Sequence, residues 1–260
     1  MDGVEAKVIN DRDPLGTRMK GYEAAARLVL PRRTYTVVRV DGKAFHTFLR
    51  HASKPWDNNV VACMRATALG LCEVLDGAVL AYTQSDEISV VLQDFENNGT
   101  QAWFGGVVQK MASVGAAHAT AFFTREYRYH FDLEDDDPLP VFDARVFTIP
   151  DVVEVANYLI WRQRDAMRNS VLALAQSLYS HRELQGEGVQ GLAQRLRVEK
   201  GIDWEQDVPP GLQRGWLVCK IQEGEGEQLR TRWDVGAAPE FKADGSGVLA
   251  QLLPAPRLLV

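Results

Sequence analysis

The alternation of hydrophobic and polar residues predicts a fixed order of strands and helices in the first half of the chain. β-branched residues dominate from 35 to 40 and stop at Asp41, which predicts a strand that ends in a turn. From 60 to 75, apolar residues recur at three- and four-residue steps, as on one face of a helix. Asp57 is suited to cap the start of this helix and Gly77 to end it.

Two short strands are expected next, over 78–82 and 88–92, with a polar hairpin connection over 83–87. A helical stretch follows over 101–123, and an alternating pattern over 142–149 predicts a fourth strand. The order strand, helix, strand, strand, helix, strand is the split βαβ arrangement of a ferredoxin-like layer, with helices on one face of an antiparallel sheet.

The second half of the chain has a different pattern of hydrophobic and polar residues. A helix is predicted over 152–179, and a hairpin with strands over 216–221 and 228–233. Between them, three glycines mark a looser segment: Gly186, Gly188 and Gly191. We therefore expect an α+β protein with a palm-like core and N-terminal extension over 1–150. Residues 151–260 are expected to form a helical and hairpin region packed on that core.

Composition is consistent with an ordinary globular protein. Of the 260 residues, 46% are hydrophobic and 25% are charged, which fits one large domain or a core with an appendage. The net charge of −6 argues against a general nucleic-acid coat protein. It leaves room for RNA binding through a local basic stripe, because phosphate contacts act over only about 8–10 Å.

The cysteines and the absence of long apolar runs bear on the compartment. The three cysteines are odd in number and form no C-x-x-C pair, so they are interpreted as small core residues in a reducing environment: Cys63, Cys72 and Cys219. No secretory signal and no membrane-spanning run are visible. We expect a cytoplasmic protein with no membrane partner.

Acidic residues fall where two predicted strands meet. Asp41 ends the first strand, and Asp86 and Glu87 lie in the hairpin before the third. In this topology the first and third strands are central neighbours, so these carboxylates are expected at the same edge of the sheet. Mg²⁺ prefers oxygen ligands and is usually held by one or two carboxylates together with phosphate oxygens. Two such ions can clamp the attacking and leaving oxygens of a displacement at phosphorus.

Neighbouring residues fit a phosphate site. Gly42 lets backbone approach a phosphate and frees its carbonyl as a ligand, and the segment 41–46 offers backbone N–H groups to a triphosphate. Three basic residues are candidates for neutralising phosphate: Arg39, Lys54 and Lys110. An isolated Asp-Gly is usually only a turn and an isolated lysine usually lies at the surface, so the functional interpretation depends on their joint placement.

Five segments, in order, resemble signatures of tRNA(His) guanylyltransferase and its Thg1-like relatives. They are Arg39-Val40-Asp41-Gly42-Lys43-Ala44-Phe45-His46-Thr47-Phe48, Lys54-Pro55-Trp56-Asp57, Ala81-Tyr82-Thr83-Gln84-Ser85-Asp86-Glu87-Ile88-Ser89, Phe142-Asp143-Ala144-Arg145 and Tyr158-Leu159-Ile160-Trp161-Arg162-Gln163. The resemblance extends from about Gly16 to Asp165, more than half of the chain, and the combination of motifs is highly specific.

The resemblance implies a polymerase-like palm that extends the 5′ end of tRNA in the 3′–5′ direction. A nucleoside triphosphate, ATP or GTP, would first activate a 5′-monophosphate end, and the 3′-hydroxyl of an incoming nucleotide would then attack it. Asp41, the Gly42 carbonyl and Asp86 match the ligands of two Mg²⁺ ions, and Glu87 is assigned to the catalytic set. The nucleotide site matches these residues: Asp41, Gly42, Lys43, Ala44, Phe45, His46, Ser85 and Asp86. Family members tend to be tetramers, so a homotetramer is expected.

One departure from the family pattern bears on the substrate. Eukaryotic guanylyltransferases carry H-I-N-N-L-Y-N where this chain has Met167 to Ala173, and only Asn169 is retained. This favours template-dependent repair of 5′-truncated tRNA over addition of an extra G to tRNA(His), which remains the alternative. Several basic residues are candidates for tRNA contacts: Arg162, Arg164, Arg168, Arg195, Arg197 and Lys200.

Two other classes of function compete with this interpretation. A nucleotide cyclase palm would share the fold and the paired carboxylates but would have no use for the K-P-x-D and W-R-Q segments. A non-catalytic RNA-binding protein would not need both carboxylates, and its acidic balance would be a handicap.

Overall fold

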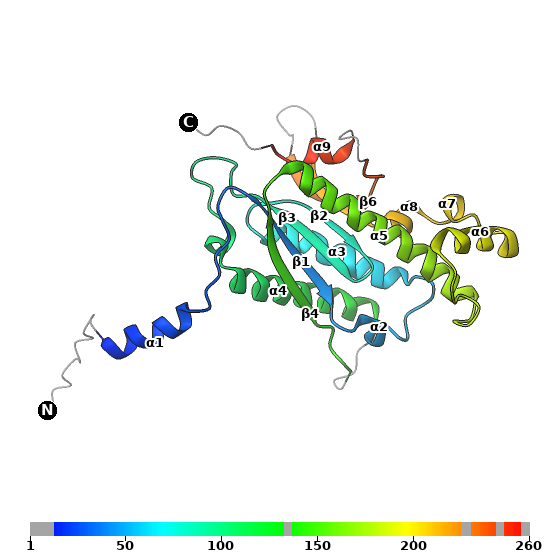
Figure 1. Ribbon diagram of the computed structural model, residues 1–260, viewed down its shortest axis with the longest axis horizontal. Coiled ribbons are helices and arrows are strands. Elements are labelled where there is room, and N and C mark those ends of the chain that lie inside the picture. The colour runs from blue at the N-terminus through cyan, green and yellow to red at the C-terminus, as the bar shows by residue number, and fades with distance from the viewer. Residues whose placement is uncertain (1–12, 133–136, 225–229, 243–246, 256–260) are drawn as a thin grey trace.

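A six-stranded antiparallel sheet lies at the centre of the computed structural model (Figure 1), which describes residues 13–132, 137–224, 230–242 and 247–255. Its strand order is β4-β1-β3-β2-β5-β6. The strands are β1 (Tyr35–Gly42), β2 (Ala78–Gln84), β3 (Glu87–Leu92), β4 (Phe142–Ile149), β5 (Trp216–Glu223) and β6 (Arg230–Ala237). The first four have the ferredoxin-like order with β1 and β3 in the middle, so the predicted fold class is confirmed.

Two helices cover one face of this sheet, α3 (Asn58–Val74) and α4 (Val108–His130) (Figure 1). Alternate residues of β1, among them Val38 and Val40, pack against the apolar sides of these helices in a buried cluster. The start of α3 is capped as predicted, because Asp57 Oδ1 accepts hydrogen bonds from two backbone N–H groups of the first turn.

The opposite face of the sheet is covered by α5 (Val152–Leu178) and, near one end, by α9 (Val248–Leu252). Tyr35 and Val37, which alternate with the residues of the first face, contact this second core together with Leu159. The predicted arrangement with helices on one face is therefore correct for α3 and α4, but it does not include α5 and α9 on the other face. The residues on the second face are apolar too, so this face also needs a covering layer to keep them out of water.

The glycine-marked segment after α5 is helical from residue 189 onward, and the expectation of a looser segment is wrong there. Helix α6 (Val189–Lys200) buries Leu192 and Leu196, one turn apart, against the end of α5. Two short helices complete this third cluster, α7 (Trp204–Asp207) and α8 (Pro210–Arg214). Packing of one apolar stripe outweighs the low helix propensity of a single internal glycine.

Several element boundaries differ from those predicted. Instead of starting at 101, the second palm helix is preceded by a short 3₁₀ turn, η1 (Trp103–Gly106), because Phe104 and two glycines adopt positive φ angles. The last strand runs to Ala237, and residues 228 and 229 of its predicted start lie outside the described residues. Several short helices were not predicted, among them α2 (Phe45–Phe48). Helix α1 (Pro14–Ala24), also not predicted, projects from the body with no buried side chain (Figure 1).

The three cysteines are free thiols. Cys63 and Cys72 are buried between α3 and its neighbours, as expected for small core residues, and Cys219 is half-buried. Burial raises the pKa of the Cys63 thiol to about 12, so it stays protonated and unreactive at neutral pH. In the described part of the chain, no helix combines the length and apolar character needed to cross a bilayer.

Whether residues 151–260 stabilise the palm is testable with two valines of α5. Val155 is fully buried against the sheet, whereas Val153, two positions earlier, is 61% exposed. Val155→Ala is expected to lower the free energy of unfolding by about 1.5–2.5 kcal/mol, since it removes two buried methyl groups and leaves a cavity. Val153→Ala is the matched control and is expected to change it by less than about 0.5 kcal/mol. Chemical denaturation followed by circular dichroism measures both, and equal effects would contradict a shared core.

Candidate active site

The two predicted metal-binding segments meet at one edge of the sheet. Asp41, near the end of β1, is the cross-strand partner of Glu87 at the start of β3. Asp86 lies in the turn between β2 and β3, and its backbone carbonyl accepts a hydrogen bond of 3.0 Å from the Gly42 N–H. The structure therefore places the Asp41-Gly42 segment against the Asp86 turn, as the strand order predicted.

Gly42 is fixed by packing as well as by this hydrogen bond. A Cβ atom at Gly42 would come within 2.4 Å of the Phe45 ring. That ring is 2% exposed and contacts Phe123 and Phe142 edge-on, so it has little room to move away. Between them, Ala44 adopts a left-handed conformation and starts α2. The absence of a side chain at Gly42 thus lets the Phe45 ring pack directly against the end of β1.

The turn that carries Asp86 is held tightly. Ser85 adopts a left-handed conformation with φ of 50°, and its side chain hydrogen bonds to the Asp86 carboxylate. The Thr83 hydroxyl donates a 2.9 Å hydrogen bond to the Glu87 carbonyl and closes the turn. The backbone is therefore constrained on both sides of Asp86.

The electrostatics of the pair fit a divalent cation. Burial raises the pKa of the Asp86 carboxyl, and the nearby Asp41 carboxylate raises it further. Within the described ranges, no ion pair joins Asp41 or Asp86 to a lysine or arginine. A bound cation would offset this repulsion.

The ligand set is incomplete without a substrate. No group of three or more His, Cys, Asp or Glu side chains is arranged to hold a metal among the residues that the structure describes. Asp41, Asp86 and the Gly42 carbonyl supply only part of an octahedron. This suits Mg²⁺, which usually keeps water and takes phosphate oxygens as its other ligands.

A cavity of about 320 Å³ opens beside Asp86. Predicted nucleotide-site residues line it: Phe45, His46, Lys54, Ser85 and Asp86. Its size lies at the lower end of the range for small-molecule sites. The structure thus joins the segment after β1, the β2–β3 turn and the Lys54 segment around one space.

The sequence-based prediction missed the wall of this cavity that comes from the second half of the chain. Residues of α5, α8 and the start of β5 contribute it: Ala166, Asn169, Ser170, Ala173, Gly211, Leu212, Gly215 and Trp216. A Cβ at Gly211 would meet the Trp216 ring at 2.4 Å, so this wall is closely packed. The α5 members recur at three- and four-residue steps, a small-residue face that the sequence alone could have revealed.

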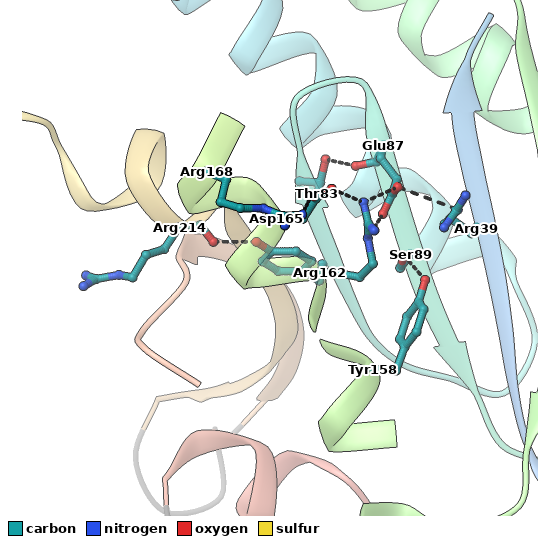
Figure 2. Close-up of polar contacts among 10 residues, drawn as sticks. Arg39, Thr83, Glu87, Ser89, Tyr158, Arg162, Asp165, Arg168 and Arg214 are labelled. Atoms are coloured by element: carbon teal, nitrogen blue, oxygen red, sulfur yellow. Dashed lines mark hydrogen bonds and ion pairs between the residues drawn. The ribbon is translucent and has the colours of Figure 1, made fainter. Parts of the chain in front are cut away.

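Glu87, predicted as catalytic, is not among the residues that line this cavity. Its carboxylate forms two hydrogen bonds with the Arg162 guanidinium, at 2.8 and 2.9 Å, and lies 3.7 Å from Arg39 Nε (Figure 2). Burial raises the pKa of Glu87, while the charge of Arg162 opposes that rise. A carboxylate engaged in this way is not free to touch the reacting atoms.

The structure corrects the assignment of three basic residues. Arg162 is 6% exposed, so it is not one of the arginines open to tRNA. Arg39 approaches the buried Glu87 instead of the phosphate cavity. Lys110 lies in the first turn of α4, 13 positions or about 20 Å of helix before Phe123, the α4 residue that contacts Phe45. A sequence pattern could not separate these residues from Lys54, because it does not show which end of a helix or which face of a strand meets the site.

The other basic candidates are at the surface, with different partners. Arg164 is exposed and forms no ion pair with any described residue, and Arg168 is exposed and paired with Asp165. On α6, Arg195 is paired with Glu187 and Glu199, and Arg197 with Asp203. Among the exposed arginines of this set, Arg164 is therefore the one with no ion pair to a described residue.

Comparisons with known proteins agree with this geometry. Residues 16–150 match the family model described as tRNAHis guanylyltransferase, Thg1. A bacterial Thg1-like protein solved in complex with ATP is 38% identical with a TM-score of 0.79, and the alignment covers 88% of this chain and 94% of that chain. Its counterpart in complex with GTP is 36% identical with a TM-score of 0.72, covering 89% and 95%.

Among curated sequences, the probable tRNA(His) guanylyltransferase of Homo sapiens is 34% identical over 143 residues. That match covers 53% of this chain and 45% of the human protein, so the similarity spans less than half of the human sequence.

Proposed function

This chain belongs to the tRNA(His) guanylyltransferase (Thg1) family, and on that premise we propose that it adds nucleotides to the 5′ end of tRNA in the 3′–5′ direction, guided by a template strand. One observation carries the proposal: the segments of Asp41 and Asp86 meet at the edge of a palm sheet, beside a cavity lined by Lys54 and His46. ATP and GTP are the proposed nucleotides, since related bacterial proteins were solved in complex with each.

The proposed reaction has two displacements at phosphorus. In the first, an oxygen of the tRNA 5′-monophosphate attacks the α-phosphorus of a nucleoside triphosphate and releases pyrophosphate. In the second, the 3′-hydroxyl of an incoming nucleotide attacks the phosphorus of the tRNA 5′ phosphate and releases the nucleoside monophosphate. Both steps develop charge on non-bridging oxygens, and both need the attacking and leaving oxygens in line.

Named residues of the chain fit this chemistry. Asp41, Asp86 and the Gly42 carbonyl would hold two Mg²⁺ ions, which when bound stabilise the charge that develops on the phosphoryl oxygens. Backbone N–H groups after β1 and the side chain of Lys54, which lines the cavity, would bind the triphosphate and offset its charge. The wall formed by α5 and α8 would limit the access of water to the reacting atoms.

The family pattern at Met167–Ala173 favours templated repair of truncated tRNA over dedicated addition of G. Asn169, the one retained residue of the guanylyltransferase motif, lines the cavity, and its neighbours on that wall are Ala166, Ser170 and Ala173. These small side chains give the wall few groups with which to select a guanine. Selection would then come from pairing with the template base.

Templating predicts a specific change of product. With a tRNA lacking its first 5′ nucleotide, replacing the opposing base in the 3′ half of the acceptor stem is expected to switch the incorporated nucleotide to its Watson–Crick partner. Labelled triphosphates and product sequencing measure this, and the intact tRNA is the control, because its first 5′ nucleotide already pairs with the base that was replaced. Incorporation of G opposite every base would overturn the repair proposal and support tRNA(His) guanylyltransferase activity instead.

The proposed tRNA surface, assembly and location complete this picture. Arg164 and Arg168 lie exposed on α5, the helix that also lines the cavity, and are the proposed phosphate contacts nearest to the site. The protein is proposed to act as a cytoplasmic homotetramer, in which several subunits contribute basic surface to one tRNA. This would compensate for a net charge of −6.

A further inference from the structure

Glu87 adjoins both metal-binding segments. It follows Asp86 directly in the chain, and it is the cross-strand partner of Asp41 in the β1–β3 register. Cross-strand partners lie on the same side of a sheet, so the Glu87 and Asp41 side chains share the face that α5 covers. A free carboxylate here would be a third anionic group beside the proposed metal ligands.

The side chain of Arg162 takes up the carboxylate of Glu87. Arg162 reaches from α5 and donates two parallel hydrogen bonds to it, one from Nε at 2.8 Å and one from an Nη atom at 2.9 Å (Figure 2). Only an arginine offers this pair of donors in one plane. Both side chains are almost fully buried, with exposed fractions of 8% and 7%.

Arg162 is itself held in place. One of its Nη atoms also donates a 2.9 Å hydrogen bond to Asp165, and its guanidinium lies 4.4 Å from the centre of the Trp161 ring. Arg39 lies on the other side of Glu87 (Figure 2), at 3.7 Å and with no hydrogen bond to it. The carboxylate of Glu87 is therefore bound from α5 and bordered from β1, with both of its oxygens engaged.

Burying the Arg162–Glu87 ion pair costs hydration energy, which apolar side chains in the same place would not lose. A buried ion pair contributes little net stability compared with apolar side chains of similar size, because both charges lose their hydration. A pair placed at the junction of two ligand segments has another use. It determines which carboxylate oxygens a cation can reach, as groups next to metal ligands commonly do.

We propose that Arg162 is a positioning residue of the metal site, which holds the Glu87 carboxylate away from the ions so that only Asp41 and Asp86 present oxygens to them. This inference rests on the proposed function, because it takes Asp41 and Asp86 as ligands. Arg162 touches neither metal nor substrate, and it acts through Glu87. Without its two hydrogen bonds, Glu87 turns toward the ligand segments and changes the geometry of the site.

The test measures metal binding without catalysis. Mn²⁺ alone is titrated into the full-length protein, with neither nucleotide nor RNA present, and free Mn²⁺ is followed by electron paramagnetic resonance. Arg162→Lys keeps the charge but loses the paired donors, and Glu87→Gln removes the acceptor's charge. Arg162→Lys is expected to weaken Mn²⁺ binding roughly tenfold or more, the usual effect of altering a group that orients a metal ligand. Glu87→Gln leaves no carboxylate that could turn toward the ions, so it is expected to bind Mn²⁺ within about twofold of the wild type. The double variant is expected to bind Mn²⁺ more tightly than Arg162→Lys alone, because the carboxylate that Arg162 restrains is then absent.

Arg32→Lys is the matched control. Arg32 forms an ion pair with the buried Asp94 and donates a hydrogen bond to the Thr100 carbonyl, at the end of the sheet away from Asp41. Thermal unfolding is measured for every variant. Both arginine variants are expected to lower the unfolding temperature, but only Arg162→Lys should weaken Mn²⁺ binding. If the Arg162 variant fails to fold, Asp165→Asn replaces it, because it removes one support of Arg162 from a partly exposed site and is expected to weaken binding by a smaller factor.

The possible outcomes separate the two proposals. If Asp86→Ala binds Mn²⁺ as well as the wild type does, or if the wild type does not bind it, the proposed metal site fails and this inference fails with it. If binding depends on Asp86 but Arg162→Lys keeps wild-type affinity within about twofold, only the positioning role of Arg162 is overturned. A double variant that binds Mn²⁺ no more tightly than Arg162→Lys would likewise overturn it, since this would mean that Arg162 acts by a route other than the Glu87 carboxylate.

Discussion

Asp86→Ala is expected to abolish nucleotide addition while leaving the protein folded. The carboxylate is the proposed ligand of both ions, and losing such a clamp removes several kcal/mol of transition-state stabilisation. Since each 1.4 kcal/mol corresponds to about a tenfold change in rate, the expected loss is about a thousandfold or more. The loss should appear in kcat and not mainly in KM, because the ions act most strongly on charge that develops during the displacement.

The fold is expected to tolerate this change for an electrostatic reason. Burial and the neighbouring Asp41 raise the pKa of Asp86, which means that its ionised form is less favourable in the folded protein than in the unfolded chain. At neutral pH the charged side chain therefore destabilises the fold, and its removal should leave the unfolding temperature unchanged or higher.

Single-turnover extension of a 5′-truncated tRNA, together with thermal unfolding, checks both expectations. Asp76→Ala is the matched control, because Asp76 is also an aspartate in a turn but is exposed and precedes β2, away from the β2–β3 turn. Near-normal rates for Asp86→Ala would refute the two-metal assignment. A large decrease in the unfolding temperature would show that Asp86 stabilises the turn. The loss of activity would then be explained by unfolding and would not support a catalytic role.

Gly42→Ala is expected to be the next most damaging change. The new Cβ would lie 2.4 Å from the Phe45 ring, which is enclosed by other aromatic rings, so the segment from Asp41 to His46 must shift. Overpacking of this kind costs about 1–3 kcal/mol of stability. A displacement of about 1 Å near the reacting atoms reduces the rate by about a hundredfold, so activity should fall much more than stability.

Gly236→Ala provides the control for this substitution. Gly236 lies in β6 and has no atom within 4 Å of the position of an added Cβ, so alanine should be accommodated there with little change. Extension rate and denaturant unfolding are measured for both variants. Equal effects, or a fully active Gly42→Ala enzyme, would mean that the Phe45 ring has room to move and that the close approach does not define the site.

The sequence by itself determined the elements whose signals are local. Periodicity and capping residues correctly gave the order and type of the palm strands and helices, since a period of two or of 3.6 is visible in neighbouring positions. The start of α4 differed, because positive φ angles in η1 delay the helix. The strand order then put Asp41 and Asp86 at one edge, because a ferredoxin-like sheet leaves β1 and β3 as central neighbours. Family signatures added the chemistry that these positions are proposed to perform.

Tertiary structure alone decided which side chains pair and which surfaces meet. Glu87 and Arg162 are 75 positions apart, and nothing near either one predicts that α5 lies over this part of the sheet. For the same reason Arg162 was assigned to the surface, Lys110 to the site, and the α8 wall of the cavity to no function. Local patterns fix backbone conformation over a few residues. Which distant residues become partners depends on how whole faces pack, here the apolar face of α5 on the sheet. That packing buries Arg162 and Glu87 as an ion pair, whereas the sequence shows only two separate charged residues.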